Sequence, residues 1–184
     1  MKKIWCLSNF SIILGLCVYL SGCCQIPPYS PGYWNDAGLI QSWNNCYNYG
    51  NNKRTDTYAQ PGKAAGAQYP RPITCNGVYN AAIDDGLDMV QASGDCPSGY
   101  FKKTDKLALV VAPGSSFNDF HWYRLGTDGK WSHKPGGGRA TDLDNSGNPI
   151  SNPQTANRGL YTDFCGYLCS CSDDGQGKGH ENIR

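Results

Sequence analysis

The sequence lacks the features of a membrane-embedded protein, a helical bundle or a strongly charged binding surface. After residue 22, no apolar run reaches the length of about 18 residues that a membrane-spanning helix needs. Methionine occurs only twice, and leucine and isoleucine are scarce, so the composition does not favour a helical bundle. The net charge is +1, which gives no electrostatic reason to expect nucleic acid or an anionic surface as a partner.

The residues that are abundant indicate a loop-rich domain. The chain has 23 glycines, 11 prolines and 12 tyrosines, a composition that favours many turns around a core containing tyrosine and tryptophan. No internal repeat is evident. The roughly 160 residues that follow the N-terminal leader fit one domain.

The N-terminus has the pattern of a secretory signal over residues 1–22. Lys2 and Lys3 precede an apolar run at residues 12–20, which is too short to span a bilayer permanently. The ending Leu20-Ser21-Gly22-Cys23 resembles the bacterial lipobox. This resemblance implies cleavage before Cys23, acyl chains on that residue and a lipidated tether at residues 23–36. It also implies a location in the cell envelope, outside the cytoplasm, and in the outer membrane if the cell is Gram-negative. The alternative is an ordinary secretory signal.

Periodicity after the tether predicts helices first and strands afterwards. Apolar residues at helical spacing begin near Asp36, and a second helix is expected at residues 77–92. Residues 106–112 are expected to form a central strand. A β-hairpin with its turn at Asp128-Gly129 is expected at residues 118–136, and a last strand at residues 160–167. The predicted fold class is α+β, with N-terminal helices packed on a small antiparallel sheet, loop-rich and stabilised by disulfides. The globular domain is expected at residues 37–171, followed by a disordered tail at residues 172–184.

The cysteines predict a disulfide framework with one thiol left over. Of the ten cysteines, Cys6 and Cys17 lie in the leader and Cys23 is the lipidation candidate. This leaves seven: Cys24, Cys46, Cys75, Cys96, Cys165, Cys169 and Cys171. In an oxidising compartment most of them should pair. We expect Cys75 with Cys96 to clamp the second helix, and Cys165 with Cys169 or Cys171 to close the terminal loop. An odd total leaves one thiol unpaired within the chain, and Cys46 is the candidate because it lies in mid-helix, far from other cysteines.

The sequence offers no strong metal or cofactor site. No C-x-x-C pair is present, which argues against zinc. Residues 142–147 match the opening D-x-D-x-S-G of a calcium loop, but the twelfth position is Pro153, which cannot supply the bidentate carboxylate. A plain turn is the expected structure there. We therefore expect neither a metal nor a cofactor.

One arrangement of residues resembles an enzyme family. The segment 43–50, W-N-N-C-Y-N-Y-G, places Cys46 on an early helix, and a histidine follows much later on a sheet strand. This order resembles the papain-like cysteine hydrolases, in particular their bacterial cell-wall branch, the CHAP-type amidases. The resemblance implies that Cys46 attacks the substrate, His121 moves the proton and a third polar residue orients the imidazole. The third residue is assigned to Asp142, with these alternatives: Asp144, Asn145 and Asn152. In the amidases a glycine precedes the histidine, whereas here Phe120 does.

The choice between His121 and His133 follows from the expected hairpin register. A turn at Asp128-Gly129 pairs residues whose numbers sum to roughly 255, which puts the two histidines on opposite faces of the hairpin. Only one of them can then meet Cys46. His121 is favoured because it opens the strand that follows the central one. The alternative is that both histidines only hydrogen-bond their neighbours.

Two functional hypotheses follow from these features. In the first, the protein is a membrane-anchored cysteine hydrolase that cleaves an amide bond in a peptidoglycan stem peptide or in a protein. In the second, it is a non-catalytic surface lipoprotein whose aromatic hairpin binds glycan or a protein partner, and Cys46 is in a disulfide. Neither hypothesis includes a nucleic-acid partner. The state of the Cys46 thiol discriminates between them.

Overall fold

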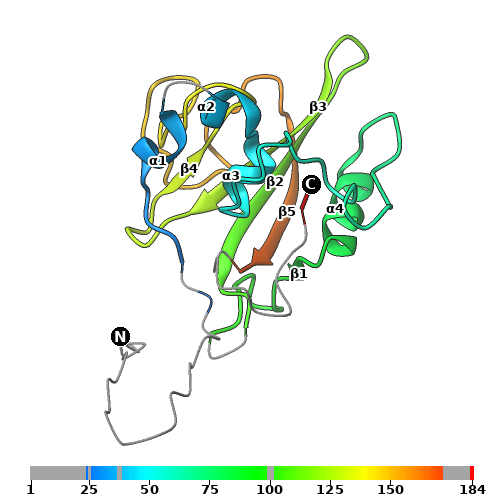
Figure 1. Ribbon diagram of the computed structural model, residues 1–184, viewed down its shortest axis with the longest axis horizontal. Helices are drawn as coiled ribbons and strands as arrows, with labels where there is room; N and C mark the ends of the chain where they lie inside the picture. Colours follow the sequence, from blue (N-terminus) through cyan, green and yellow to red (C-terminus); the bar gives the residue numbers. More distant parts are fainter. Residues whose placement is uncertain (1–23, 25, 37–38, 99–101, 172–182) are drawn as a thin grey trace, which may run out of the picture.

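A five-stranded antiparallel sheet occupies the centre of the molecule (Figure 1), in a computed structural model that describes residues 24, 26–36, 39–98, 102–171 and 183–184. The strand order within these residues is β1-β5-β2-β3-β4. The strands are β1 (Asp88–Met89), β2 (Asp105–Pro113), β3 (Asn118–Leu125), β4 (Trp131–His133) and β5 (Asp163–Ser170). Together with short helices and three disulfides, this sheet confirms the α+β, loop-rich fold class.

The strand expected at residues 106–112 lies in the middle of the sheet. It forms most of β2, which pairs with β3 on one side and β5 on the other. Its side chains alternate between two apolar clusters. Leu107 and Leu109 join the cluster under α3 and α4, while Ala108 and Val110 join the cluster on the opposite face. Because both faces are covered, this strand is a nearly continuous apolar run in the sequence.

The helices are shorter than the periodicity predicted. They are α1 (Pro31–Asn35), α2 (Leu39–Trp43), α3 (Cys46–Gly50) and α4 (Cys75–Asp84). Figure 1 shows α4 beside β5, with α1, α2 and α3 on the side of β3 and β4. The expected helix from Asp36 is broken at Asn45, whose extended backbone and side chain make it the N-cap of α3. The helix expected at residues 77–92 begins with Thr74 as its cap and ends before Gly86, which has a φ of +102°.

The disulfide pairs differ from those predicted. Cys75 bonds Cys165, and Cys96 bonds Cys169. The expected Cys75–Cys96 clamp is therefore wrong, as is a bond from Cys165 to Cys169 or Cys171. The third disulfide joins Cys24 to Cys171. Sequence proximity was misleading because antiparallel strand order brings the C-terminal cysteines of β5 against α4 and β1.

The two ends of the chain are described only in part. The predicted signal at residues 1–22 and the predicted lipid-bearing Cys23 lie outside the described residues. Most of the predicted tail, residues 172–182, also lies outside them. Within the tail, Ile183 is buried in the main apolar cluster, and the carbonyl of Arg184 accepts a hydrogen bond from the backbone N–H of Gln60. Across the described residues, no helix has the length and apolar character needed to cross a membrane.

Candidate functional site

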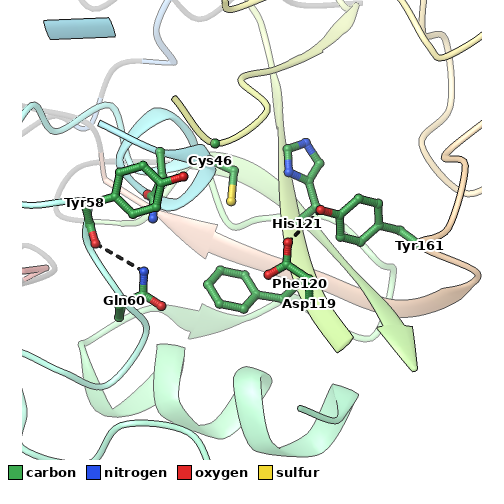
Figure 2. Close-up of a pocket in the computed structure, with 9 residues that line it drawn as sticks. Cys46, Tyr58, Gln60, Asp119, Phe120, His121 and Tyr161 are labelled. Carbon is green, nitrogen blue, oxygen red and sulfur yellow. Dashed lines mark hydrogen bonds between the residues drawn. The ribbon is translucent and has the colours of Figure 1, made fainter. Parts of the chain in front are cut away.

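A small open pocket lies where α3 begins beside β3, and it brings together two of the predicted site residues, Cys46 and His121 (Figure 2). Its volume of about 70 Å³ is several times the 10–15 Å³ or so that one water molecule needs. The lining residues come from α3, the segment after it, β3 and two later loops. They are Asn45, Cys46, Tyr58, Gln60, Asp119, Phe120, His121, Gly136 and Tyr161.

Cys46 contributes a free but buried thiol. It is the first residue of α3, directly after the capping Asn45, and only 5% of its surface is exposed. Burial raises the pKa of this thiol to about 12, and the negative charge of Asp119 adds to the effect. Hydrogen bonding from the backbone of Trp122, Cys46 and Tyr47 opposes the rise without cancelling it. The thiol is therefore protonated at neutral pH, whereas a nucleophilic cysteine needs its thiolate.

The two hairpin histidines lie on the same face of the sheet, contrary to the sequence prediction. Tyr123 pairs with His133 across β3 and β4, so the numbers of paired residues sum to 256 and the parity is reversed. His121 and His133 consequently touch, with 2.7 Å between His121 Nε2 and His133 Nδ1. Among the described residues, no hydrogen bond joins either histidine to the sulfur of Cys46.

The hydrogen bonds of His133 determine the tautomer of both rings. Burial lowers the pKa of each histidine, that of His121 well below the ordinary value and with a further contribution from His133, so both rings are neutral. His133 Nε2 lies 3.0 Å from the carbonyl oxygen of Leu143, which can only accept, so this nitrogen carries the proton. His133 Nδ1 must then accept from the Nε2–H of His121. The remaining nitrogen of His121, Nδ1, is left with an unshared lone pair.

Asp119 and Tyr161 form the acidic side of the pocket. The Tyr161 hydroxyl donates to Oδ2 of Asp119 over 2.8 Å, as the dashed line in Figure 2 shows. Burial and this carboxylate raise the pKa of Tyr161, which keeps the phenol protonated. Among the described residues, Asp119 has no lysine or arginine as an ion-pair partner. The half-buried carboxylate thus has no ion-pair partner among the described residues.

The opposite wall consists of Tyr58, Gln60 and Gly136. The Gln60 amide donates to the carbonyl of Tyr58 over 3.2 Å, and its oxygen accepts from the Tyr69 hydroxyl over 2.7 Å. A Cβ added at Gly136 would lie 2.7 Å from the Tyr58 hydroxyl oxygen, and Gly136 has a φ of +44°. Glycine is therefore needed at this position for the tyrosine to close the wall.

Lys134 is buried behind this wall and holds the chain that enters α3. Its ammonium group donates to the carbonyl oxygens of Gln41, Asn44 and Gly136. Burial lowers its pKa to about 8. All three hydrogen atoms of the ammonium group are accounted for by these carbonyls, so Lys134 positions the backbone beside the pocket and is not a substrate ligand.

The residues predicted as the third member of a catalytic site lie elsewhere. Asp142 lies beside Tyr29, whose pKa is raised by burial and by the charge of this carboxylate, and it does not line the pocket. Asp144 closes a turn by accepting from the backbone N–H groups of Ser146, Asn148 and Asn157. These bonds occupy the carboxylate that a calcium loop would need. In the described part of the chain, no group of three or more acidic, histidine or cysteine side chains could hold a metal ion.

Sequence reasoning missed Asp119 and Tyr161 as members of the pocket, and it did not place His133 beside His121. Asp119 and Tyr161 are 42 residues apart and meet only because β3 and the segment before β5 lie on either side of β2. No local sequence pattern predicts this contact. His133 was within reach of the sequence, since a hairpin register differing by one residue puts it beside His121.

Comparison with known proteins identifies a relative of this chain. The chain is similar to a protein named insoluble matrix shell protein 1, from Ruditapes philippinarum. The two are 45% identical over 140 residues, which cover 76% of this chain and 87% of that protein. No family model matches the chain, and no solved structure matches it.

This similarity overturns the interpretation drawn from the two bacterial motifs. The relative is a shell matrix protein of a mollusc, neither a bacterial lipoprotein nor a cysteine hydrolase. The predictions of a lipid anchor at Cys23, a bacterial cell-envelope location and a peptidoglycan substrate are therefore wrong. A lipobox is a four-residue pattern and a cysteine followed by a distant histidine is a pattern of two, so both arise readily without common ancestry.

Proposed function

Since the chain belongs to the same family as insoluble matrix shell protein 1, we propose that it is a secreted, non-catalytic structural protein that interacts with other components of an extracellular matrix. The observation that carries this proposal is the 45% identity, because it extends over 87% of the relative and so includes nearly all of that protein. The shared region is long enough to contain the central sheet and its short helices.

The disulfide bonds support an extracellular location. Three disulfides connect distant parts of the chain, which is typical of proteins from oxidising compartments. The secretory pattern at residues 1–22 agrees with this, and we retain it as a cleavable signal followed by one domain over residues 37–171. Cys24 joins the segment before this domain to Cys171 at its end, so the disulfide framework encloses the whole domain.

The chemistry of the pocket supports a non-catalytic role. A nucleophilic cysteine needs a thiolate that is stabilised by a nearby imidazolium. Here burial disfavours both ions, since it raises the pKa of Cys46 to about 12 and lowers that of His121. His121 donates to His133 and not to the sulfur. The pocket thus holds neutral groups where a cysteine hydrolase has an ion pair.

Fractionation of the source organism tests this proposal. Extracellular material is separated from cells and extracted with chelator and then with denaturant, and the insoluble residue is digested and analysed by mass spectrometry. We expect peptides from residues 39–171 in the insoluble extracellular fraction. Recovery only from the cytosolic fraction would contradict the proposal.

A binding experiment with the purified protein tests the role of the folded domain. The disulfide-bonded chain is incubated with the washed insoluble residue and sedimented, and the reduced and alkylated chain serves as the control. We expect the native chain to co-sediment and the reduced chain, which has lost the framework, to bind less. Equal sedimentation of both forms would mean that the fold plays no part in matrix association.

A further inference from the structure

We propose that the pocket between α3 and β3 binds a primary alkylammonium group, of the kind carried by a lysine side chain or a small aliphatic amine. This goes beyond a structural role in a matrix, because it assigns a ligand chemistry to a particular cavity. The cavity could be occupied or empty whether or not the protein resides in a matrix.

The first observation is that two acceptor atoms of residues that line the pocket have no hydrogen-bond partner among the described residues. The relay from His121 through His133 to the Leu143 carbonyl leaves His121 Nδ1 as a bare lone pair on a side chain that is only 4% exposed. Asp119 Oδ2 accepts a hydrogen bond from the Tyr161 hydroxyl, and Asp119 Oδ1 has no partner among the described residues. Both atoms belong to residues that line the open pocket, so a ligand that donates hydrogen bonds finds two acceptors there.

The second observation is the charge of the lining residues. Asp119 is the acidic residue among them, and the pocket is lined by no lysine or arginine. Cys46, Tyr58 and Tyr161 have raised pKa values and His121 has a lowered one, all chiefly through burial, so each is neutral near pH 7. The lining residues therefore carry one negative charge and no positive one, and the Lys134 ammonium behind Gly136 is held by three backbone carbonyls. A cation that donates hydrogen bonds fits this lining, and a carboxylate or phosphate ligand does not.

The third observation is the combination of size and aromatic surface. The volume of about 70 Å³ accommodates several non-hydrogen atoms, as an ammonium head with part of its alkyl stem requires. Figure 2 shows the rings of Phe120 and Tyr161 beside the carboxylate of Asp119, and the ring of Tyr58 on the other side of Cys46. Aromatic faces attract cations and also cover an alkyl stem. Tyr58 is 43% exposed and stands at the open side, where a ligand would enter.

The experiment is a titration of the full disulfide-bonded protein, followed by amide chemical shifts in NMR spectra. The probes are n-butylammonium, the neutral 1-pentanol and two acetylated, amidated tripeptides, Gly-Lys-Gly and Gly-norleucine-Gly. We expect saturable shifts of the pocket residues with n-butylammonium or the lysine peptide, and none with the alcohol or the norleucine peptide. Tighter binding of the peptide identifies a protein side chain as the ligand, and tighter binding of n-butylammonium identifies a free amine.

Two variants connect the binding to the pocket. Asp119→Asn removes the negative charge and should weaken ammonium binding by about tenfold or more. Asp163→Asn, which changes a carboxylate at the exposed start of β5, is the matched control and should bind like the wild type. Tyr58→Leu removes the ring at the open side and should also weaken binding. It keeps the proposal testable if Asp119→Asn does not fold.

Three results would overturn the proposal. They are equal shifts with the charged and neutral probes, unchanged affinity in both pocket variants, and no saturable shift with either amine. None of these would affect the matrix assignment, which depends on fractionation. Conversely, a cytosolic location would leave the ammonium site intact.

Discussion

At the scale of single residues, Cys46 shows how position and environment can oppose each other. Its place at the start of α3, with backbone N–H groups nearby, favours a thiolate, but burial outweighs this and raises the pKa to about 12. We predict that iodoacetamide modifies Cys46 about a thousandfold more slowly than free cysteine at pH 8, because so little thiolate is present. The rate, followed by mass spectrometry, should still be rising above pH 10.

The same chain unfolded in urea without reductant is the control for this reaction. There Cys46 should react like ordinary cysteine, with the label on its peptide confirmed by mass spectrometry. Rapid modification of the native protein near pH 6 would show a stabilised thiolate and contradict the structural assignment.

The histidine pair predicts a loss of stability in mild acid. Both folded-state pKa values are lowered by burial, so below about pH 6.5 the unfolded chain binds protons that the folded chain excludes. The contribution of the two neutral histidines to the free energy of unfolding is complete above that pH. It is lost as the pH falls toward their folded-state pKa values. Each histidine should contribute a slope of up to about 1.4 kcal/mol per pH unit. Urea denaturation between pH 5 and pH 7 measures it.

A His121→Gln variant provides the comparison. Glutamine can donate a hydrogen bond to His133 but does not titrate, so the slope between pH 5 and pH 7 should fall by about half. A wild-type free energy of unfolding that does not change over this range would contradict the buried, neutral state of the pair.

At the scale of elements, the sequence predicted those parts that depend on local patterns. The apolar run at residues 106–112 became β2, and the glycine at the expected hairpin turn, Gly129, has a φ of +77°. The register was wrong because the loop has five residues, 126–130, and an odd number reverses the parity that a two-residue turn implies. This one-residue difference in register decides whether His121 and His133 lie on opposite faces of the hairpin or on the same face. The helix expected from Asp36 was wrong for an equally local reason, the cap at Asn45.

The cap at Asn45 is therefore the critical residue of the α3 element. Its side chain accepts from the N–H groups of Tyr47 and Asn48 and donates to the carbonyl of Ala59, all within a buried site. We predict that Asn45→Ala lowers the free energy of unfolding by about 2–4 kcal/mol, from the lost cap and the buried groups left unpaired. Thr74→Ala, at the exposed cap of α4, should cost only about 1 kcal/mol.

Urea denaturation of both variants measures this difference. If the two substitutions cost the same, the buried contacts of Asn45 contribute nothing beyond the ordinary cap. A loss of pocket binding in Asn45→Ala without a loss of stability would instead place its role in orienting Cys46.

At the scale of the whole molecule, the non-local features could not be predicted. The disulfide partners are 73, 90 and 147 residues apart, and no spacing in the sequence identifies them. The pocket has the same origin, since Asp119, Tyr161 and Cys46 come from three distant segments that meet only in the folded sheet. The predicted function was also wrong, because it depended on two short motifs. The similarity to the shell matrix protein extends over most of the chain and outweighs them.

The three disulfides all attach the C-terminal strand region to the rest of the molecule. Cys165 and Cys169 lie on β5 and Cys171 follows it, and their partners lie on α4, after β1 and before α1. We predict that replacing any one pair with serine lowers the free energy of unfolding by about 2–5 kcal/mol. Loop length alone separates the largest and smallest loops by only about 0.6 kcal/mol, so the three costs should be similar.

Removing all three pairs should leave little folded protein, since the summed loss of about 6–15 kcal/mol is comparable to the roughly 5–15 kcal/mol that stabilises a typical domain. Urea denaturation without reductant measures each paired variant, and near-UV circular dichroism reports on the triple one. Cys46→Ala is the control, because it removes a cysteine but no disulfide. A triple variant that keeps the native spectrum would show that the sheet and its two apolar clusters suffice to hold the domain together.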